Sequence, residues 1–122
     1  MVNEIVKASI ITIGDELMIG QVIDSNSAFI AQQLNKEGIW IRRRVAVGDD
    51  RDEIRKALDE ESAHSKVILI TGGLGPTADD ITKPLLCEYF GMTLVRNEKV
   101  LAHVRNLFEN VFKRPFTEIN MK

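Results

Sequence analysis

Glycines and acidic residues occur together at three points of this sequence, each time directly after a short apolar run. The three groups are Gly14-Asp15-Glu16, Gly48-Asp49-Asp50 and Thr71-Gly72-Gly73-Leu74-Gly75, the last of which leads to Asp79-Asp80. Glycines let main-chain N–H groups approach an anion closely, and the start of a following helix favours negative charge. Carboxylates at the same place would repel a phosphate unless a cation lay between them. Asp49 and Asp80 therefore indicate a divalent cation such as Mg²⁺, which prefers oxygen ligands.

A site of this kind suits attack on a phosphoanhydride, or its formation, because a metal ion neutralises developing charge and positioning supplies most of the remaining catalysis. The same residues also have simpler interpretations. The glycines of the third group could do no more than allow a tight turn, and their spelling alone favours neither interpretation. Asp49 or Asp50 could cap a helix that begins at Arg51. Asp79 or Asp80 could lie in the first turn of the next helix.

Four β-rich apolar runs alternate with four amphipathic runs, which predicts a three-layer α/β sandwich with a mostly parallel sheet and helices on both faces. The predicted strands cover residues 8–13, 39–47, 67–71 and 92–95. The first predicted helix follows a capping cluster at 24–27 and stops at Gly38, and the others cover 51–64, 82–90 and 98–112. Residues 67–71 are the most continuously apolar, so we expect them at the centre of the sheet. Ligands of open α/β sheets bind beyond the carboxyl ends of the strands, so the three groups should share one rim.

Length and composition indicate one globular domain over residues 1–122, with 44% apolar and 28% charged residues. The net charge of -2 gives no electrostatic basis for a nucleic-acid partner. A single cysteine excludes an internal disulfide and fits a reducing compartment. The start of the chain lacks a signal-peptide pattern and no apolar run approaches roughly 20 residues, so we expect a cytoplasmic protein without membrane contact. The run Arg42-Arg43-Arg44 lies in a predicted strand and indicates a solvated, charged sheet edge that discourages pairing with another sheet.

In their order along the chain, these motifs resemble the molybdopterin-binding (MoaB/Mog-like) domain. The GDEL, DSN and GGLGPT-x-DD spellings are most similar to the CinA branch, the N-terminal domain of competence/damage-inducible protein A. The resemblance spans almost the whole chain and rests on Gly14-Asp15-Glu16-Leu17, Gly20, Asp24-Ser25-Asn26, Val47-Gly48-Asp49-Asp50, and Thr71 to Thr77 with Asp79-Asp80-Ile81-Thr82.

The resemblance implies a three-layer α/β fold, a homo-oligomer and, in the cofactor-synthesis members, binding of molybdopterin and its Mg²⁺-dependent adenylylation. For the CinA branch it implies a metal-dependent pyrophosphatase that acts on ADP-ribose-type nucleotides. By position, Asp80 matches the family's essential aspartate and Asp49 its second acidic position. The remaining ligand-binding positions match Thr71, Gly72, Gly73, Gly75, Gly14, Asp15, Glu16, Asp24, Ser25 and Asn26. Physics alone favours helix capping by Asp24-Ser25-Asn26, whereas the resemblance favours a role in the site.

Two departures from the family pattern matter. Leu74 stands where the cofactor-synthesis enzymes usually have threonine, which removes a hydroxyl donor and weakens an adenylyltransferase assignment. Relatives also continue past Lys122, so we expect this domain to lack its C-terminal part. The leading hypothesis is a CinA-like domain that binds a nucleotide or pterin phosphate and has metal-dependent pyrophosphatase activity. The alternatives are a molybdopterin-binding module without turnover, a molybdopterin adenylyltransferase-like protein, and an oligomerisation domain.

Overall fold

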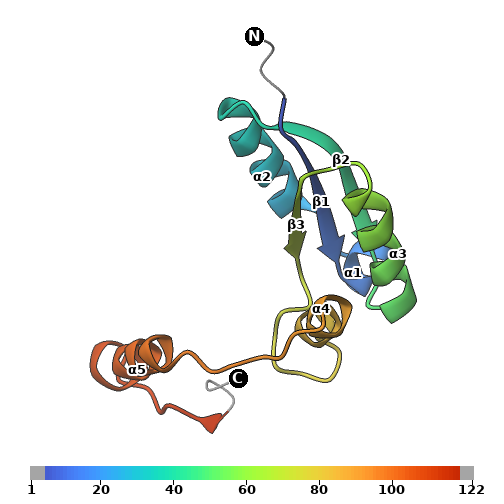
Figure 1. Cartoon of the computed structure of the whole chain (residues 1–122). Helices are drawn as coiled ribbons and strands as arrows, with labels where there is room; N and C mark the ends of the chain where they lie inside the picture. Colours follow the sequence, from blue (N-terminus) through green and yellow to red (C-terminus); the bar gives the residue numbers. More distant parts are fainter. Residues whose placement is uncertain (1–4, 119–122) are drawn as a thin grey trace.

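The computed structural model describes residues 5–118 of the chain. Its sheet has three parallel strands, β1 (Lys7–Ile13), β2 (Trp40–Val47) and β3 (Val67–Thr71), in the order β2-β1-β3. Helix α2 (Ser25–Lys36) lies on one face of this sheet and helix α3 (Arg51–Ser62) on the other (Figure 1). The connection from β1 to β2 runs to one side of β1, and the connection from β2 to β3 runs back past β1 to its other side. Right-handed crossovers in opposite directions place their helices on opposite faces of the sheet. The predicted three-layer α/β arrangement is therefore confirmed.

The hydrophobic core lies between the sheet and α3. Alternate residues of β1 point to this side, where Ile11 and Ile13 pack against apolar residues of α3 and against Leu85. Leu85 belongs to helix α4 (Thr82–Phe90), which is also joined to α3 through the Tyr89 hydroxyl, a donor to Asp59 at 2.7 Å. This packing fixes the start of α4, and with it the segment that follows β3, against the carboxyl end of β1.

Strand β1, rather than β3, is the centre of the sheet. Residues 8–13 of β1 are all buried, whereas the residues of β3 are half-buried or exposed. The prediction that residues 67–71 occupy the centre is therefore wrong for the part of the chain that the structure describes. Both runs are apolar and β-branched, so composition does not distinguish them. The directions of the two crossovers decide which strand is central, and local sequence does not encode those directions.

The other elements are α1 (Asp15–Met18), α5 (Glu98–Asn106) and one π-helical segment, η1 (Leu107–Val111). The predicted ends of α2, α3 and α4 agree with the structure to within two residues, and α4 stops at Gly91, which has φ 64° as in a left-handed glycine cap. The strand predicted at 92–95 is wrong, because this segment has no regular structure, and the helix predicted at 98–112 divides into α5 and η1. No helix within residues 5–118 is long and apolar enough to cross a membrane.

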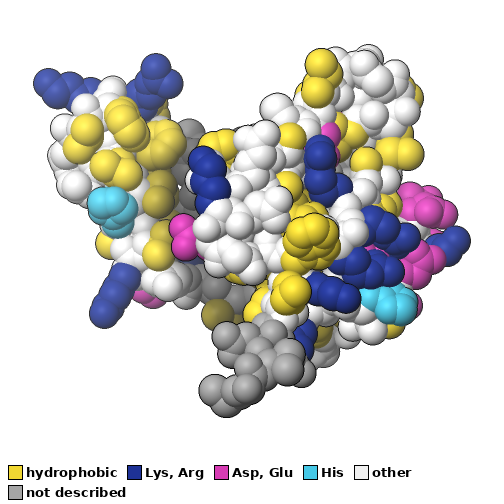
Figure 2. All heavy atoms as spheres, turned by 90° about the horizontal axis from the view of Figure 1, so that it is seen from above, with side chains coloured by type: hydrophobic (Ala, Val, Ile, Leu, Met, Phe, Trp, Pro, Cys, Tyr) yellow, Lys and Arg dark blue, Asp and Glu magenta, His cyan; other side chains and the backbone are white. Residues whose placement is uncertain are grey.

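Helix α5 and η1 form a lobe that stands away from the sheet (Figure 1). Figure 2 shows hydrophobic side chains gathered on this lobe, at the left of the view, where Val100, Val111 and Phe112 are each more than half exposed. The lobe has a small aromatic cluster of its own, in which the Phe108 ring meets those of Phe112 and Phe116 at centroid distances of 6.1 and 6.0 Å. It therefore contributes little to the core that positions the strand ends.

A buried carboxylate, Glu61, neutralises part of the arginine run near the amino-terminal end of the sheet. The register between β1 and β2 shifts after Ala8, so that Arg42 is an extra residue and both Arg42 and Arg43 face α3. Glu61 accepts hydrogen bonds from Ser9 Oγ at 2.7 Å and Arg42 Nη1 at 2.8 Å, and a further one from Arg43. The edge position predicted for the arginines is confirmed, but two of the three are ion-paired rather than simply solvated.

The charge of Glu61 should therefore contribute to stability. Burial opposes ionisation and raises its pKa, but hydrogen bonds from Ser9 and Arg43 outweigh burial and hold the pKa below its ordinary value. A lowered folded-state pKa stabilises the protein above the unfolded-state pKa, and this stabilisation is lost as the pH falls through the folded-state value. Substituting Glu61→Gln should lower the free energy of unfolding at pH 7 by about 3 kcal/mol in urea titrations, since two arginines lose their shared partner.

The matched control is Glu60→Gln, which removes an exposed carboxylate that contacts Arg43 at 3.2 Å. Its effect should stay below about 0.5 kcal/mol, as for other surface ion pairs. The difference between the two variants should also shrink at low pH. Equal losses for both variants, or a difference that does not depend on pH, would contradict a stabilising role for the buried charge.

Candidate functional site

The three glycine–acid groups lie at one edge of the sheet, as predicted. Ile13 pairs with Val47 and Thr12 with Thr71, so all three strands end at the same edge. The Gly14 N–H donates to the Val47 carbonyl at 2.9 Å, which holds the end of β1 against the end of β2. The chain leaves β1 toward β2 on one side and returns to β3 on the other, so the gap between β1 and β3 is the topological switch point, the usual ligand position in such sheets.

Asp15 and Asp49 are held together by a reciprocal pair of hydrogen bonds. The Asp15 N–H donates to Asp49 Oδ2 at 3.2 Å, and the Asp49 N–H donates to Asp15 Oδ1 at 2.9 Å. A Cβ atom at Gly48 would lie 2.7 Å from Asp15 Oδ1, so glycine at this position leaves room for the pair. The adjacent Asp50 instead caps α3 by accepting from the Glu53 N–H at 3.0 Å. Of the two alternatives for Asp49 and Asp50, capping therefore applies to Asp50.

The loop after β3 packs so closely on β1 that it requires glycine. Gly72 and Gly73 have φ of 91° and 63°, which L side chains rarely adopt. A Cβ atom at Gly72 would lie 2.0 Å from the Ile13 carbonyl oxygen, and one at Gly73 would lie 2.3 Å from Thr82 Oγ1. The buried Thr82 closes the loop, because its hydroxyl donates to the Gly72 carbonyl at 2.9 Å and its N–H to the Gly73 carbonyl at 3.1 Å. Glycine is thus required by packing as well as compatible with an anion site.

The Asp80 carboxylate is turned into this loop, between Gly75 and Thr77. Its Oδ2 accepts from the Thr77 N–H at 3.2 Å and from the Thr77 hydroxyl, and a Cβ atom at Gly75 would lie 2.6 Å from the same oxygen. The hydroxyl of Thr77 is the main cause that lowers the pKa of Asp80, with further contributions from main-chain N–H groups and Lys83. Asp80 is therefore ionised at neutral pH and fixed in direction.

Asp24 lies on the other face of β1, where it caps α2. Its Oδ1 accepts from the Ser27 N–H at 3.1 Å and its Oδ2 from the Ser27 hydroxyl at 2.5 Å. Burial raises the pKa of Asp24, but the bonds from Ser27 outweigh it and keep the pKa below its ordinary value. Ser25 and Asn26 are exposed in the first turn of α2. Capping is thus confirmed for Asp24, and the role of Ser25 and Asn26 in a site stays a prediction.

Several residues of this region are not among the predicted site residues. Thr77 and Thr82 belong to the motif that carries the resemblance, and a threonine hydroxyl beside a glycine loop is a signal for a hydrogen-bond donor. Arg44 donates from Nε to the Ser27 hydroxyl at 3.1 Å, although it lies in the run interpreted as an edge. The buried hydroxyl of Thr12 lies near the Asp24 carboxylate and helps to lower its pKa. Arg44 and Thr12 contact residues that are distant in sequence, so spacing alone gives no signal for either of them.

Comparison with known proteins identifies the family. Residues 9–120 match the family model described as "Probable molybdopterin binding domain". The chain belongs to this family. A CinA-like protein of Flavobacterium psychrophilum is 53% identical over 114 residues, which are 93% of this chain and 27% of that protein. A CinA-like protein of Cytophaga hutchinsonii is 53% identical over 106 residues, 87% of this chain and 25% of that protein. The molybdopterin-binding domain described here therefore spans about a quarter of the length of these relatives.

Solved structures of the molybdopterin-binding domain family share the fold. CinA from Thermoplasma acidophilum, a protein of unknown function, superimposes on this chain with a TM-score of 0.77 at 33% sequence identity. The superposition covers 97% of this chain and 68% of the CinA chain. The tungsten cofactor synthesizing protein MoaB from Pyrococcus furiosus superimposes with a TM-score of 0.68 at 25% sequence identity. That superposition covers 92% of this chain and 69% of the MoaB chain. These matches confirm the predicted resemblance and the α/β fold with a parallel sheet.

The donors at the rim fit a hydrated magnesium ion better than an ion enclosed by protein. Among the residues that the structure describes, no group of three or more His, Cys, Asp or Glu side chains is placed to hold a metal ion. Mg²⁺ commonly binds one or two carboxylates and completes its octahedral shell with waters and substrate phosphates. The side chain that the structure places beside Asp49 is Asp15, whereas the hydrogen bonds of Asp80 described above lie within its own loop. Joint ligation by Asp49 and Asp80 stays a prediction.

The close packing of the glycine loop can be tested by comparing two glycines with positive φ. Substituting Gly72→Ala adds backbone strain and a clash with the Ile13 carbonyl, whereas Gly20→Ala adds strain alone, since nothing lies within 4 Å of a Cβ atom there. The Gly72 variant should lose about 2 kcal/mol more of the free energy of unfolding than the Gly20 variant. Urea titrations measure the difference, and equal losses would show that the loop does not pack on β1 as described.

The state of Asp80 can be tested through its partner. Substituting Thr77→Val removes the donor that lowers the pKa of Asp80, so that pKa should rise toward its ordinary value. Thr77→Ser keeps a hydroxyl and should leave the pKa low. Carboxyl-carbon NMR titration of both variants measures the pKa directly. A pKa for Asp80 that is the same in the wild type and in Thr77→Val would contradict the contact.

Proposed function

We propose that this domain binds a nucleotide of the ADP-ribose type at the rim and, with a divalent cation, hydrolyses its pyrophosphate. The observation that carries the proposal is the Asp80 carboxylate, kept ionised by Thr77 inside a glycine loop at the switch point of the sheet. A carboxylate turned into an anion-type loop is unfavourable beside a phosphate unless a cation joins the two. The substrate class is the one that the resemblance to the CinA branch implies, and the relatives named CinA-like proteins are 53% identical to this chain.

Each part of the rim has a distinct role in this proposal. The main-chain N–H groups of residues 72–74 bind a phosphate, and the dipole of α4 adds to the attraction. Asp49 and Asp80 hold the cation, and the reciprocal bonds between Asp15 and Asp49 keep Asp49 directed to the rim. A bound divalent cation would neutralise charge on the phosphate oxygens and lower the pKa of a water. Attack of water on one phosphorus breaks the bridging P–O bond and gives AMP and ribose 5-phosphate, and the two protons of the water go to solvent or stay on the phosphate monoesters.

A second candidate function is binding of molybdopterin without turnover. It is favoured by the family description that residues 9–120 match and by the likeness to MoaB from Pyrococcus furiosus. Leu74, which is about half exposed on the loop, offers a pterin an apolar contact in place of a hydroxyl. The same rim serves both candidates, since each ligand carries a phosphate. Association into a homo-oligomer accompanies either candidate, and the exposed apolar side chains of the α5 lobe are consistent with it.

The test is incubation of the protein with ADP-ribose and Mg²⁺, Mn²⁺ or Co²⁺, with AMP measured by chromatography. Substituting Asp80→Asn should lower the rate of AMP formation by about 10²-fold or more, because the cation that activates the water would lose a charged ligand. Asp79→Asn is the matched control, since it makes the same change one residue away on an exposed side chain. It should stay within about threefold of the wild type.

The outcomes separate the two candidates. AMP formation that Asp80→Asn leaves unchanged would remove Asp80 from the site. Absence of AMP with every metal, together with saturable binding of a pterin phosphate, would favour the binding module and overturn the pyrophosphatase. Circular dichroism of each variant confirms that a loss of activity is not a loss of fold.

A further inference from the structure

A groove beside Trp40 lies apart from the rim, where β2 begins. Trp40 is the single tryptophan of the chain and is 60% exposed. Two hollows of about 310 and 510 Å³ share Trp40 and Asn35 in their linings, so they form one groove between α2 and β2. We call it the Trp40 groove. Tryptophan is one of the side chains that are enriched at binding hot spots, and here it is exposed beside a concave surface.

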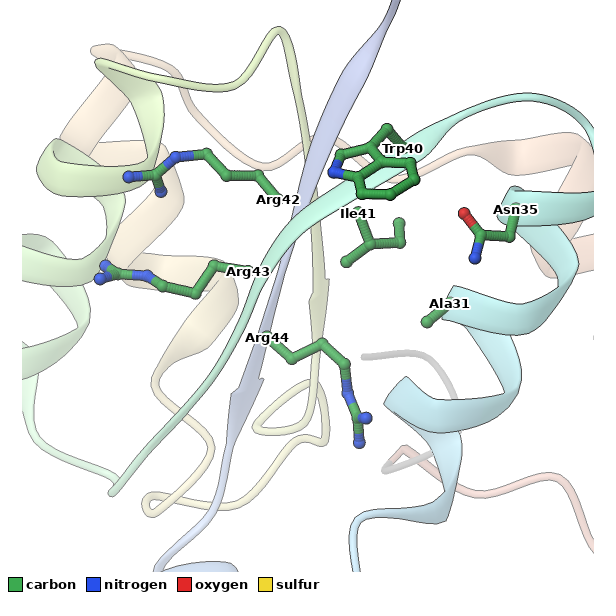
Figure 3. Close-up of a pocket in the computed structure, with 7 residues that line it drawn as sticks. All are labelled: Ala31, Asn35, Trp40, Ile41, Arg42, Arg43 and Arg44. Atoms are coloured by element: carbon green, nitrogen blue, oxygen red, sulfur yellow. The ribbon is translucent and has the colours of Figure 1, made fainter.

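The lining of the Trp40 groove combines an apolar floor with cationic ends. Ile41 of β2 and Ala31 of α2 point toward one another across the floor, and Asn35 points in from α2 (Figure 3). Arg44 extends toward α2 at one end, and Lys36 lines the hollow at the other. Among the described residues, the linings of both hollows contain no carboxylate. The groove therefore suits a ligand with apolar side chains and negative charge.

The outer edge of β2 is open alongside this groove. Strand β2 is an edge strand of the described sheet. The Trp40 N–H donates to the Val6 carbonyl and the Val47 carbonyl accepts from Gly14, so the main-chain groups of Trp40 and Val47 face β1. Because the groups of successive residues in a strand point to opposite sides, those of Ala46 and Arg44 face outward. Such unpaired N–H and C=O groups are a template for one more strand.

We propose that the Trp40 groove and the β2 edge bind an extended acidic peptide segment, which adds a fourth strand to the sheet beside β2. Main-chain hydrogen bonds to the outward groups supply affinity, and alternate side chains of the peptide enter the groove. Its apolar side chains pack on Ile41 and the Trp40 ring. Its carboxylates meet Lys36 and Arg44. A second copy of this chain does not suit the edge, because two β2 strands would place their arginine runs against each other.

The proposal does not depend on the proposed pyrophosphatase. Trp40 begins β2, whereas Asp49 and Asp80 follow the ends of β2 and β3, so the two sites lie at different ends of the strands. A variant of the groove should therefore change peptide binding without changing AMP formation. Peptide binding and AMP formation are measured in separate experiments, so either proposal can fail while the other holds.

The experiment uses Trp40 as the reporter, since no other tryptophan contributes to the emission. The probe is an acetylated and amidated octapeptide of alternating glutamate and valine, which has no aromatic residue. Its addition should shift the Trp40 emission to shorter wavelength in a saturable way, and the affinity should fall as salt is added. An octapeptide with lysine in place of glutamate should not bind. One with proline in place of every valine should not bind either, because proline cannot donate to a ladder.

Three variants test the surface. Lys36→Glu should weaken the acidic peptide at least about fivefold, whereas Lys99→Glu makes the same charge change on the α5 lobe and should have no effect. Ala46→Pro removes an outward N–H at a strand edge, where proline is tolerated, and should also abolish binding. If that variant loses its circular dichroism signal, the two lysine variants and the proline peptide still decide.

Four results would overturn the proposal. The first is equal binding of the acidic peptide and its proline form, and the second is equal binding of the acidic and basic peptides. The third is an emission shift that grows with protein concentration in the absence of peptide, which would indicate pairing of two β2 edges. The fourth is saturation of the shift by ADP-ribose with none by the peptide, which would indicate a small-molecule site.

Discussion

The position of the loop after β3 depends on its close contact with the carbonyl oxygen of Ile13. At this contact, Gly72 has no room for a side chain on its α-carbon. The contact brings the loop against the end of the most deeply buried strand, so the loop takes its position from the core rather than from solvent. Thr82 then anchors the start of α4 to the same loop, and Leu85 of α4 completes the core. The close packing of the loop and its backbone conformation are thus properties of the same few glycines.

The carboxylates at the two ends of the sheet have different hydrogen-bond and ion-pair partners. Glu61 near the amino-terminal end is fully buried, forms ion pairs with two arginines and accepts a hydrogen bond from a serine, so its charge is paired within the fold. Asp15, Asp49 and Asp80 at the carboxyl end accept hydrogen bonds from main-chain N–H groups and a hydroxyl, which direct their carboxylates, and Lys83 adds a positive charge near Asp80. Directed carboxylates at a switch point are compatible with the binding of a cation and a phosphate. The difference locates the candidate site independently of any family comparison.

The arginine run shows how one local irregularity can separate two roles. Without the shift in register after Ala8, Arg42 and Arg43 would point to opposite faces, and only one of them would reach Glu61. With the shift, both bind the buried carboxylate, and Arg44 turns to α2 and the Ser27 cap. The same strand therefore supports the core on one face and orders the start of α2 on the other, and its outer edge beside Trp40 has no partner strand within residues 5–118.

Much of the fold follows from local chemistry, which is why it was predictable. Apolar periodicity and capping residues gave α2, α3 and α4, and the alternation of elements gave the parallel sheet and hence a shared rim. The segment 92–95 has strand-like composition but no partner strand among the described residues, so composition alone misled there. The prediction of capping at Asp49 or Asp50 was open because either side chain could reach the first turn of α3. The hydrogen bond from the Glu53 N–H to Asp50 and the bonds between Asp15 and Asp49 separated the two.

By itself, the sequence determined the strands β1 to β3 and the helices α2 to α4, the glycines that tolerate positive φ, and the grouping of acids at strand ends, because these depend on residues within a few positions of one another. Tertiary structure alone decided that β1 is central, that Asp49 pairs with Asp15, that Glu61 joins Ser9 to two arginines, and that the β2 edge stays open beside Trp40. Those outcomes depend on crossover direction and strand register, which bring together residues 30 or more positions apart for two of these contacts. Local propensity carries no information on such distances, since many registers satisfy the same pattern.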